Sequence, residues 1–389
     1  MKEPKIRFKG FRGEWETSII GDMCSISTGK SNTQDKIEDG KYPFYVRSPF
    51  VERSNKFLFD EEAVLTVGDG VGTGKVFHYV NGKYDLHQRV YRMFDFCNIY
   101  AKYFYYYFST KFYKRVMSMT AKSSVDSVRM DMIADMKIDY PSTVEQQSIA
   151  SYFQHLDSLI QSTTKKIESL KQVKAASLQS MFPQEGETTP RVRFKGFEGE
   201  WSICPLKYFA KKSTEKNISM DYTITLTNSA EYGVINQRDF FDHDISNDDH
   251  INGYYVIHHD DFVYNPRVST AAPVGPISRN RLGYSGVMSP LYLIFRVNGI
   301  NKDFLSYYFK TTLWHNYMKL EGNTGARFDR LAISDEQFFN MPIYYPKDEE
   351  EQTAIASYFT NLDRQITLHT QRLEKLKQIK SACLDNMFV

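Results

Sequence analysis

The sequence of 389 residues lacks most of the features that mark membrane, secreted and metal-binding proteins. Nothing in it approaches roughly eighteen consecutive apolar residues, and its start, MKEPKIRFKG, has no apolar signal-peptide core. Its four cysteines are scattered, with no C-x-x-C pair and no histidine cluster at ligand spacing. We therefore expect a globular cytoplasmic protein that is neither secreted nor membrane-spanning, without a disulfide framework or a metal site.

The sequence also lacks the strong positive charge with which many nucleic-acid-binding domains are recognised, since its formal net charge is only +2. Lysine and arginine are nevertheless concentrated in two stretches without any acid, residues 96–125 and 262–301. These stretches predict either two basic surfaces for nucleic acid or the solvated faces of a helix and a hairpin. Composition favours neither alternative.

No motif in the sequence completes a catalytic site. Residues 68–75 (GDGVGTGK) resemble a phosphate loop, but Asp69 stands at the first glycine position and Val76 at the Ser/Thr position, so we expect a glycine-rich hairpin. Residues 258–261 (HHDD) could be metal ligands, but adjacent strand residues point to opposite faces, which favours a turn or an exposed edge. Residues 264–267 (YNPR) are similar to the N-P-P-aromatic motif of amino-methyltransferases, with arginine in place of the second proline and no glycine-rich cofactor loop elsewhere.

One long stretch occurs twice. Residues 145–182 and 351–388 are identical at about half their positions, and we expect both to be helices of about 57 Å. Apolar residues recur at alternating steps of four and three, a period typical of a coiled-coil seam, although one such stripe alone would equally indicate a core face. Two copies favour pairing of one helix with the other. The seam positions are Ile149, Phe153, Leu156, Ile160, Ile167 and Leu170, and Ile355, Phe359, Leu362, Ile366, Leu373 and Leu376.

A second repeat precedes each half of the chain. Residues 4–15 (PKIRFKGFRGEW) and 190–201 (PRVRFKGFEGEW), which we call the FKGF segments, predict packed turns with Gly10 and Gly196 at positive φ. Residues 183–190 (PQEGETTP) are polar with a proline at each end, which indicates a linker that proteases should cut first.

The blocks between the repeats follow one plan with different residues. Residues 29–140 predict short strands, including a hairpin in 64–84 with its turn at Asn81-Gly82, and then a tyrosine-rich helix over 100–119. We expect that helix to be core rather than a base-stacking platform. Residues 203–345 predict strands and then a helix over 304–320.

These features together resemble the specificity subunits of type I restriction-modification enzymes. The resemblance lies in the two FKGF…EW segments, the two EQ..IA.YF..LD..I helices with their KQ.K…MF endings, and the DFVYNP…SP.Y stretch. It implies an α+β protein in which two mixed α/β target-recognition domains are joined by two long helices. These would form an antiparallel intramolecular coiled coil with a pseudo-two-fold repeat. The domain boundaries would be 1–144 and 191–345 for the recognition domains, 145–182 and 346–389 for the helices, and 183–190 for the linker.

The resemblance also implies a function without catalysis in this chain. Each domain would read one half of a bipartite, asymmetric double-stranded DNA target, and the helices would set the spacing and dock two methyltransferase subunits, to which restriction subunits attach. S-adenosylmethionine and ATP would bind the partners and not this chain. The alternative is a stand-alone tandem DNA-binding protein or coiled-coil scaffold.

Candidate DNA-binding residues are polar loop residues chosen by type and place, because base edges are read by hydrogen bonds and phosphates by cations. In the first domain they are Tyr45, Arg47, Lys75, His87, Gln88, Arg89, Lys122 and Ser123. In the second they are Asn228, Ser229, Arg238, Asn265, Arg267, Ser269, Arg279, Arg281, Thr324 and Arg327. The expected docking face of the helices contains Gln161, Lys165, Lys171, Thr367, Gln371 and Lys377.

Overall fold

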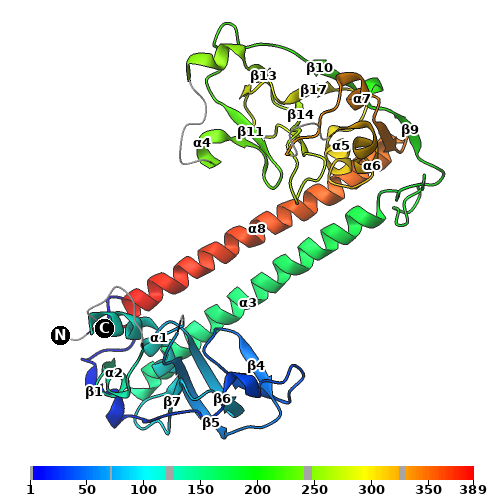
Figure 1. Ribbon diagram of the computed structural model, residues 1–389. Helices are drawn as coiled ribbons and strands as arrows, with labels where there is room; N and C mark the ends of the chain where they lie inside the picture. Colours follow the sequence, from blue (N-terminus) through cyan, green and yellow to red (C-terminus); the bar gives the residue numbers. More distant parts are fainter. Residues whose placement is uncertain (1–2, 71, 120–126, 241–247, 324–328) are drawn as a thin grey trace. The chain divides into compact units, whose positions relative to one another are not determined.

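A computed structural model describes residues 3–70, 72–119, 127–240, 248–323 and 329–389. The chain divides into two compact units (Figure 1). The first unit contains Met1–Lys165 and His369–Val389, and the second contains Lys166–Leu368. Two long helices, α3 (Thr143–Ser180) and α8 (Glu349–Met387), each contribute one part to each unit. In the described residues, no helix is both long and apolar enough to cross a membrane.

The first unit is built on a six-stranded sheet in the order β2-β7-β5-β6-β3-β4, in which only the β3–β6 pairing is parallel. A separate antiparallel pair joins β1 to β8. Its elements are β1 (Glu16–Ile19), η1 (Ile20–Asp22), β2 (Ser25–Thr28), η2 (Thr33–Asp35), β3 (Tyr42–Tyr45), β4 (Val51–Ser54), β5 (Phe59–Val67), β6 (Phe77–Leu86), β7 (Val90–Phe94), α1 (Ala101–Ser118), α2 (Met130–Ala134) and β8 (Lys137–Tyr140).

The second unit is built on a four-stranded antiparallel sheet in the order β10-β17-β14-β15, with two-stranded pairs β11-β12, β13-β16 and β18-β9. Its elements are β9 (Ser202–Pro205), η3 (Leu206–Tyr208), β10 (Ala210–Ser213), β11 (Leu226–Ser229), β12 (Gly233–Asn236), α4 (Gln237–Phe240), η4 (Asp248–Gly253), β13 (Tyr255–Ile257), β14 (Phe262–Tyr264), β15 (Ile277–Arg279), β16 (Gly286–Met288), β17 (Leu293–Val297), α5 (Lys302–Tyr308), α6 (His315–Glu321), α7 (Asp335–Phe339) and β18 (Pro342–Tyr345).

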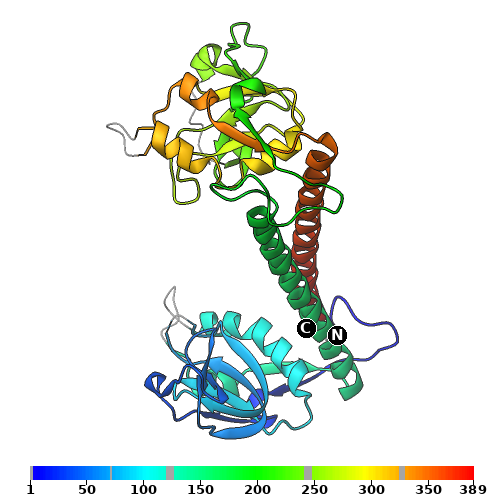
Figure 2. The same cartoon turned by 90° about the vertical axis from the view of Figure 1, so that its right-hand side faces the viewer.

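Helix α1 forms the aromatic core of the first unit, where it packs on β5 and β6 (Figure 2). Phe104, Phe108 and Phe112 are spaced by four residues and therefore lie on one face, where successive rings stack at 5.3 and 4.3 Å between centroids. Tyr103 and Tyr107 are also buried. The predicted helix and its core role are both confirmed.

The predicted hairpin exists, but its turn was misplaced. Strands β5 and β6 pair from Phe59↔Tyr84 to Thr66↔Phe77, and Asn81-Gly82 lies inside this ladder. The chain reverses instead within residues 68–76, where Gly70 and Gly74 have φ of 84° and 66°. The described residues of this stretch, 68–70 and 72–75, therefore belong to the glycine-rich hairpin loop that we expected.

The predicted helix over residues 304–320 is wrong as one element, because the structure has α5 and α6 with a break between them. Thr311 lies in the break, and its hydroxyl donates a 2.7 Å hydrogen bond to the carbonyl of Tyr308. Its oxygen also accepts from the backbone N–H of Leu313 at 3.4 Å. A short hydroxyl side chain that bonds the local backbone competes with the helical ladder.

The FKGF segments form turns, as predicted, with φ of 105° at Gly10 and 100° at Gly196. Each segment also bonds the C-terminal end of a long helix. The N–H of Ile6 donates to the carbonyl of Asn386 at 2.9 Å. The equivalent bond in the second unit joins Val192 to Ser180 at 2.8 Å.

Each FKGF segment also anchors a buried glutamate at the start of a long helix. Arg7 donates two 2.8 Å hydrogen bonds to Glu145, and Arg193 donates two of 2.7 Å to Glu351. The two glutamate side chains are only 2% and 1% exposed. The same anchor therefore occurs in both units.

In the first unit, α3 and α8 meet through Asp157. Lys380 of α8 pairs with Asp157 of α3, and Tyr106 of α1 donates a 2.7 Å hydrogen bond to the same carboxylate. Nearby, the Tyr152 hydroxyl lies 3.5 Å from Cys383 Sγ. From the first of these contacts to the second, the residue number falls from 157 to 152 along α3 and rises from 380 to 383 along α8. The two segments are therefore antiparallel.

In the second unit, the same contacts occur with the helices exchanged. Lys174 of α3 pairs with Asp363 of α8, and Tyr307 of α5 donates a 2.9 Å hydrogen bond to that carboxylate. Ser177 and Tyr358 hydroxyls lie 3.0 Å apart. Each long helix thus supplies the acid to one unit and the lysine to the other.

Candidate nucleic-acid interface

The two units place equivalent loops at the same edge of their sheets. Strands β2-β7-β5-β6 and β10-β17-β14-β15 have the same order and the same antiparallel pairings. The β5–β6 loop (68–76) therefore corresponds to the β14–β15 loop (265–276). The turn before β7 (87–89) likewise corresponds to the turn before β17 (289–292). Most of the described candidate residues lie on or beside these loops.

In the first unit, two predicted arginines converge on one carboxylate. Arg47 Nη1 lies 3.3 Å from Asp69 Oδ1, and Arg89 Nε lies 3.7 Å from Asp69 Oδ2. The arginine side chains are 48% and 65% exposed, and that of Asp69 is 26% exposed. Sequence reasoning missed Asp69, because only basic and neutral polar residue types indicate contacts with DNA when each residue is considered alone.

His87 lies beneath this pair and positions the turn that carries Arg89. Its ring is buried, and Nδ1 accepts a 3.0 Å hydrogen bond from the Arg89 backbone N–H. Burial, followed by repulsion from Arg47, lowers the pKa of His87 below its ordinary value of 6.5. His87 is therefore neutral at pH 7 and supports the turn that carries Arg89. Its contact with DNA stays a prediction.

We expect the imidazole of His87 to titrate below pH 6.5 in the folded protein. Because the folded-state pKa is lowered, the unfolded chain takes up this proton first. The stabilising contribution is therefore complete above about pH 6.5 and is lost as the pH falls through the folded-state pKa. NMR titration of the imidazole, assigned with His87→Gln, measures it. A midpoint at or above 6.5 would contradict the lowering of the pKa by burial and by Arg47.

The other described candidates of the first unit surround the same edge. Tyr45 is half-buried against the ring of His78, with centroids 4.9 Å apart. Lys75 is exposed and its Nζ lies 4.9 Å from the centre of the Tyr113 ring. Gln88 is exposed. Its Nε2 donates to Asn32 Oδ1. The predicted Lys122 and Ser123 lie outside the described residues.

In the second unit, five candidates line one cavity of about 450 Å³. Arg267 is one of the exposed ones, with its side chain 71% exposed and its Nε 3.9 Å from Asp329. Sequence reasoning missed Arg330, Gln237, Leu291 and Tyr292, which also line this cavity. The only sequence signal for the last two was the SP.Y pattern. The five candidates are Asn228, Ser229, Asn265, Arg267 and Ser269.

Two of these five fold the loop rather than face outward. Asn228 is 2% exposed, and its Nδ2 donates to the carbonyls of Val263 and Pro276 at 3.1 Å. Asn265 Nδ2 donates to the Asn228 carbonyl, and Asn265 Oδ1 accepts from the Arg267 N–H, both at 3.0 Å. Their positions indicate that they hold Arg267 in place. Ser229 and Ser269 likewise accept bonds from backbone N–H groups in their own turns.

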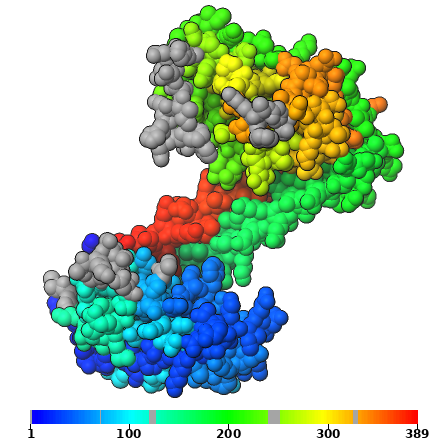
Figure 3. Space-filling model, in the orientation of Figure 1, coloured from blue at the N-terminus to red at the C-terminus, as the bar shows by residue number. Residues whose placement is uncertain are grey.

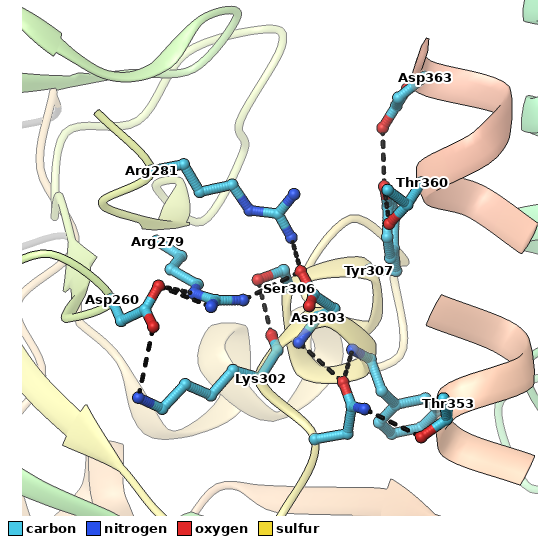
Figure 4. A network of polar contacts seen from close by, with 12 residues as sticks. Asp260, Arg279, Arg281, Lys302, Asp303, Ser306, Tyr307, Thr353, Thr360 and Asp363 are labelled. Atoms are coloured by element: carbon cyan, nitrogen blue, oxygen red, sulfur yellow. Dashed lines mark hydrogen bonds and ion pairs between the residues drawn. The ribbon is translucent and has the colours of Figure 1, made fainter. Parts of the chain in front are cut away.

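The predicted Arg279 and Arg281 lie apart from this cavity, in an ion-pair network (Figure 4). Arg279 is only 11% exposed, because it donates to Asp260 at 2.6 and 2.9 Å and to Asp303 at 3.0 Å. Arg281 is 45% exposed and also pairs with Asp303. Burial raises the pKa of Asp260, but the Arg279 hydrogen bonds outweigh it and leave the pKa lowered. This placement indicates that Arg279 has a structural role.

Three candidates remain in the second half of the sequence. Arg238 is exposed on α4, while Thr324 and Arg327 lie outside the described residues. Residues 258–261 lie at a turn between β13 and β14, where Asp260 has φ of 73°, so the predicted turn is confirmed. Among the described residues, no group of three His, Cys, Asp or Glu side chains is arranged to hold a metal ion.

The chain resembles known proteins over most of its length. The family model for the type I restriction modification DNA specificity domain matches residues 12–172 and again 200–378. The EcoDI specificity subunit of Escherichia coli is 28% identical over 182 residues, which are 46% of this chain and 40% of that subunit. The MjaVIII specificity subunit of Methanocaldococcus jannaschii is 24% identical in an alignment of 405 positions, gaps included, which covers 96% of this chain and 91% of that one.

A solved structure supports the fold. The crystal structure of the type I restriction-modification S subunit from M. genitalium superposes with a TM-score of 0.66 over 100% of this chain and 99% of that chain, at 14% identity. The DNA specificity domain therefore occurs twice in this one chain, which makes it a tandem-domain protein. The chain belongs to the family of type I restriction-modification DNA specificity subunits. The resemblance recognised in its repeated motifs is thereby confirmed.

Proposed function

We propose that each unit of this specificity subunit reads one half of a bipartite, asymmetric double-stranded DNA target. The observation that carries the proposal is the repeated loop position with different side chains. The same sheet edge carries Arg47, Lys75 and Arg89 in one unit and Arg267 with Ser269 in the other. One scaffold with two different sets of hydrogen-bonding groups suits the reading of two different half-sites.

We further propose that α3 and α8 form one antiparallel coiled coil related by a pseudo-two-fold axis, which sets the gap between the half-sites. The exchanged pairs Asp157–Lys380 and Lys174–Asp363 support this proposal. The proposed boundaries are 1–144 and 191–345 for the recognition domains, 145–182 and 346–389 for the helical parts, and 183–190 for the linker.

The exposed faces of the helices are the proposed docking surface for two methyltransferase subunits, with restriction subunits bound through the complex (Figure 3). The six predicted docking residues are all exposed, as are Val173 and Ile379 at equivalent positions of the two helices. Catalysis, S-adenosylmethionine and ATP would belong to the partners, and the complex would act in the cytoplasm. A scaffold without DNA recognition is the competing function.

Methylome sequencing of cells that contain the whole system tests the proposal and defines the target. We then expect Arg267→Ala to weaken recognition of one half-site by about 1–3 kcal/mol, because a side chain that reaches a base edge contributes this much to discrimination. Binding of the assembled complex to DNAs altered in either half is the measurement. Arg191→Ala is the matched control, since Arg191 is 66% exposed and pairs only with nearby Glu187 at 3.0 Å among the described residues. Unchanged DNA binding with Arg267→Ala would favour the scaffold alternative.

Insertion of one helical turn into α3 near residue 165 should change the tolerated gap and leave both half-sites unchanged. Four residues lengthen a helix by about 6 Å, which is roughly two base-pair steps. The gap in the methylated motif is the measurement, and a four-residue insertion in the linker 183–190 is the control. An altered half-site would contradict the proposed division of roles.

A further inference from the structure

We infer that the first unit recognises guanine in its half-site through Arg47 and Arg89, with Asp69 as the residue that positions both guanidinium groups. The inference rests on the proposed function and names the base that the first unit recognises. It is carried by the contacts of the three side chains and by the loops that hold them.

The two arginines approach Asp69 through different atoms. The Arg89 atom nearest to the carboxylate is Nε, at 3.7 Å, so the Nη1/Nη2 end of its guanidinium is not the part closest to Asp69. Arg47 uses Nη1, which leaves its Nε/Nη2 edge on the other side. Both remaining edges are forks of two parallel N–H donors. Such a fork matches the O6 and N7 acceptors of guanine in the major groove.

The backbone around Asp69 is held by the sheet. The Gly68 N–H donates to the Arg89 carbonyl at 2.8 Å, and the Val128 N–H donates to the Gly68 carbonyl at 2.7 Å. Asp69 itself forms an antiparallel bridge with Ser127. The carboxylate and the Arg89 turn are therefore fixed relative to each other, which reduces the entropy that the long side chains lose when they bind.

The carboxylate distinguishes base recognition from phosphate binding. A phosphate that approached Arg47 or Arg89 would meet the negative charge of Asp69 within a few ångströms, and like charges at this distance repel. The edge of a base carries no net charge and meets no such repulsion. An arginine pair that bound only phosphates would bind them more tightly without Asp69. An arginine that reads a base is instead held in a defined orientation by the carboxylate.

The second unit does not repeat this arrangement in its described residues. At the position equivalent to the turn of Arg89 it has Leu291, which is 58% exposed. Arg267 and Asp329 are 3.9 Å apart and both mostly exposed. The inference is therefore confined to the first half-site.

The test uses the chain assembled with its methyltransferase subunits and the target defined by the methylome. Dissociation constants are measured for the cognate DNA and for DNAs in which each G·C pair of the first half is replaced. We expect replacement of a recognised guanine to weaken wild-type binding by roughly 10- to 100-fold. This penalty should disappear at one position for Arg89→Ala and at another for Arg47→Ala.

Three further variants distinguish the effect of guanidinium orientation from the effects of positive charge and of protein folding. Arg89→Lys keeps the charge but loses the fork, so its salt dependence should match the wild type while its discrimination is lost. Asp69→Asn should reduce discrimination at both positions without a change in the second half. Lys36→Ala is the control, because Lys36 is 54% exposed and pairs with Glu52 in the same unit. Thermal unfolding of each variant confirms that it is folded.

Two results would overturn the inference. One is a first half-site that contains no G·C pair in either orientation. The other is a uniform loss of affinity for all DNAs with a salt slope reduced by about one per arginine, which is the behaviour of phosphate contacts. In both cases a bipartite target with a defined gap would still support the proposed function. A complex that binds no split target would refute the proposed function itself.

Discussion

Replacement of Arg193 with alanine is expected to lower the free energy of unfolding of the second unit by about 3–5 kcal/mol, because it leaves a buried carboxylate without its partner. Glu351 is 1% exposed and takes both of its 2.7 Å charged hydrogen bonds from Arg193. Arg193 also donates a 2.6 Å hydrogen bond to the Gly199 carbonyl, so the FKGF turn loses a contact as well.

Urea denaturation monitored by tryptophan fluorescence measures this effect. The chain has three tryptophans, and a Trp15→Phe background leaves Trp201 and Trp314, which both lie in the core of the second unit. Arg191→Ala is the matched control, since an exposed pair contributes about 0–1 kcal/mol. A loss with Arg193→Ala no larger than that with Arg191→Ala would show that the Glu351 anchor does not stabilise the unit.

Reversal of the charge at Asp363 is the second large expected effect. Asp363→Lys would place a third ammonium group beside Lys174 and Lys310 and remove the acceptor of the Tyr307 hydroxyl. We expect a loss of roughly 2–3 kcal/mol in the free energy of unfolding of the second unit, because the pair is partly buried between two helices.

The double variant Asp363→Lys with Lys174→Asp should recover part of that loss. It restores an ion pair between α3 and α8, and a coupling free energy of about 0.5–3 kcal/mol is typical for residues in contact. The same denaturation experiment measures the four members of the cycle. The equivalent cycle at Asp157 and Lys380 provides an internal comparison in the first unit. Additive effects in both cycles would mean that these ion pairs do not hold the helices together.

The repeated elements of the fold could be predicted from the sequence because their signals are local. The period of the long helices and the glycines of the FKGF segments depend on neighbouring residues only. The turn at Asn81-Gly82 was misplaced for the opposite reason. The pairing of β5 with β6 continues past Gly82, and this long-range ladder outweighs the local turn preference.

The residue types of the candidate site could be chosen from the sequence, but the surroundings of each side chain could not. Asn228 and Arg279 have side chains suited to DNA, but residue type does not reveal that one is buried under a loop and the other is enclosed by two carboxylates. Asp69 was missed because an acid is an unexpected neighbour for DNA when it is considered alone. Its relevance depends on Arg47 and Arg89, which are 22 and 20 positions away and approach it only in the folded sheet.

The division of the chain into units has a consequence for its synthesis on the ribosome. The second unit is formed by one continuous segment, Lys166–Leu368, whereas the first also requires His369–Val389. Phe388 is 3% exposed and packs at 5.5 Å from the Tyr103 ring and 5.7 Å from that of Phe153. The domain that is translated first therefore completes its core only after residues 369–389 have been made, and the domain translated second can finish folding before it.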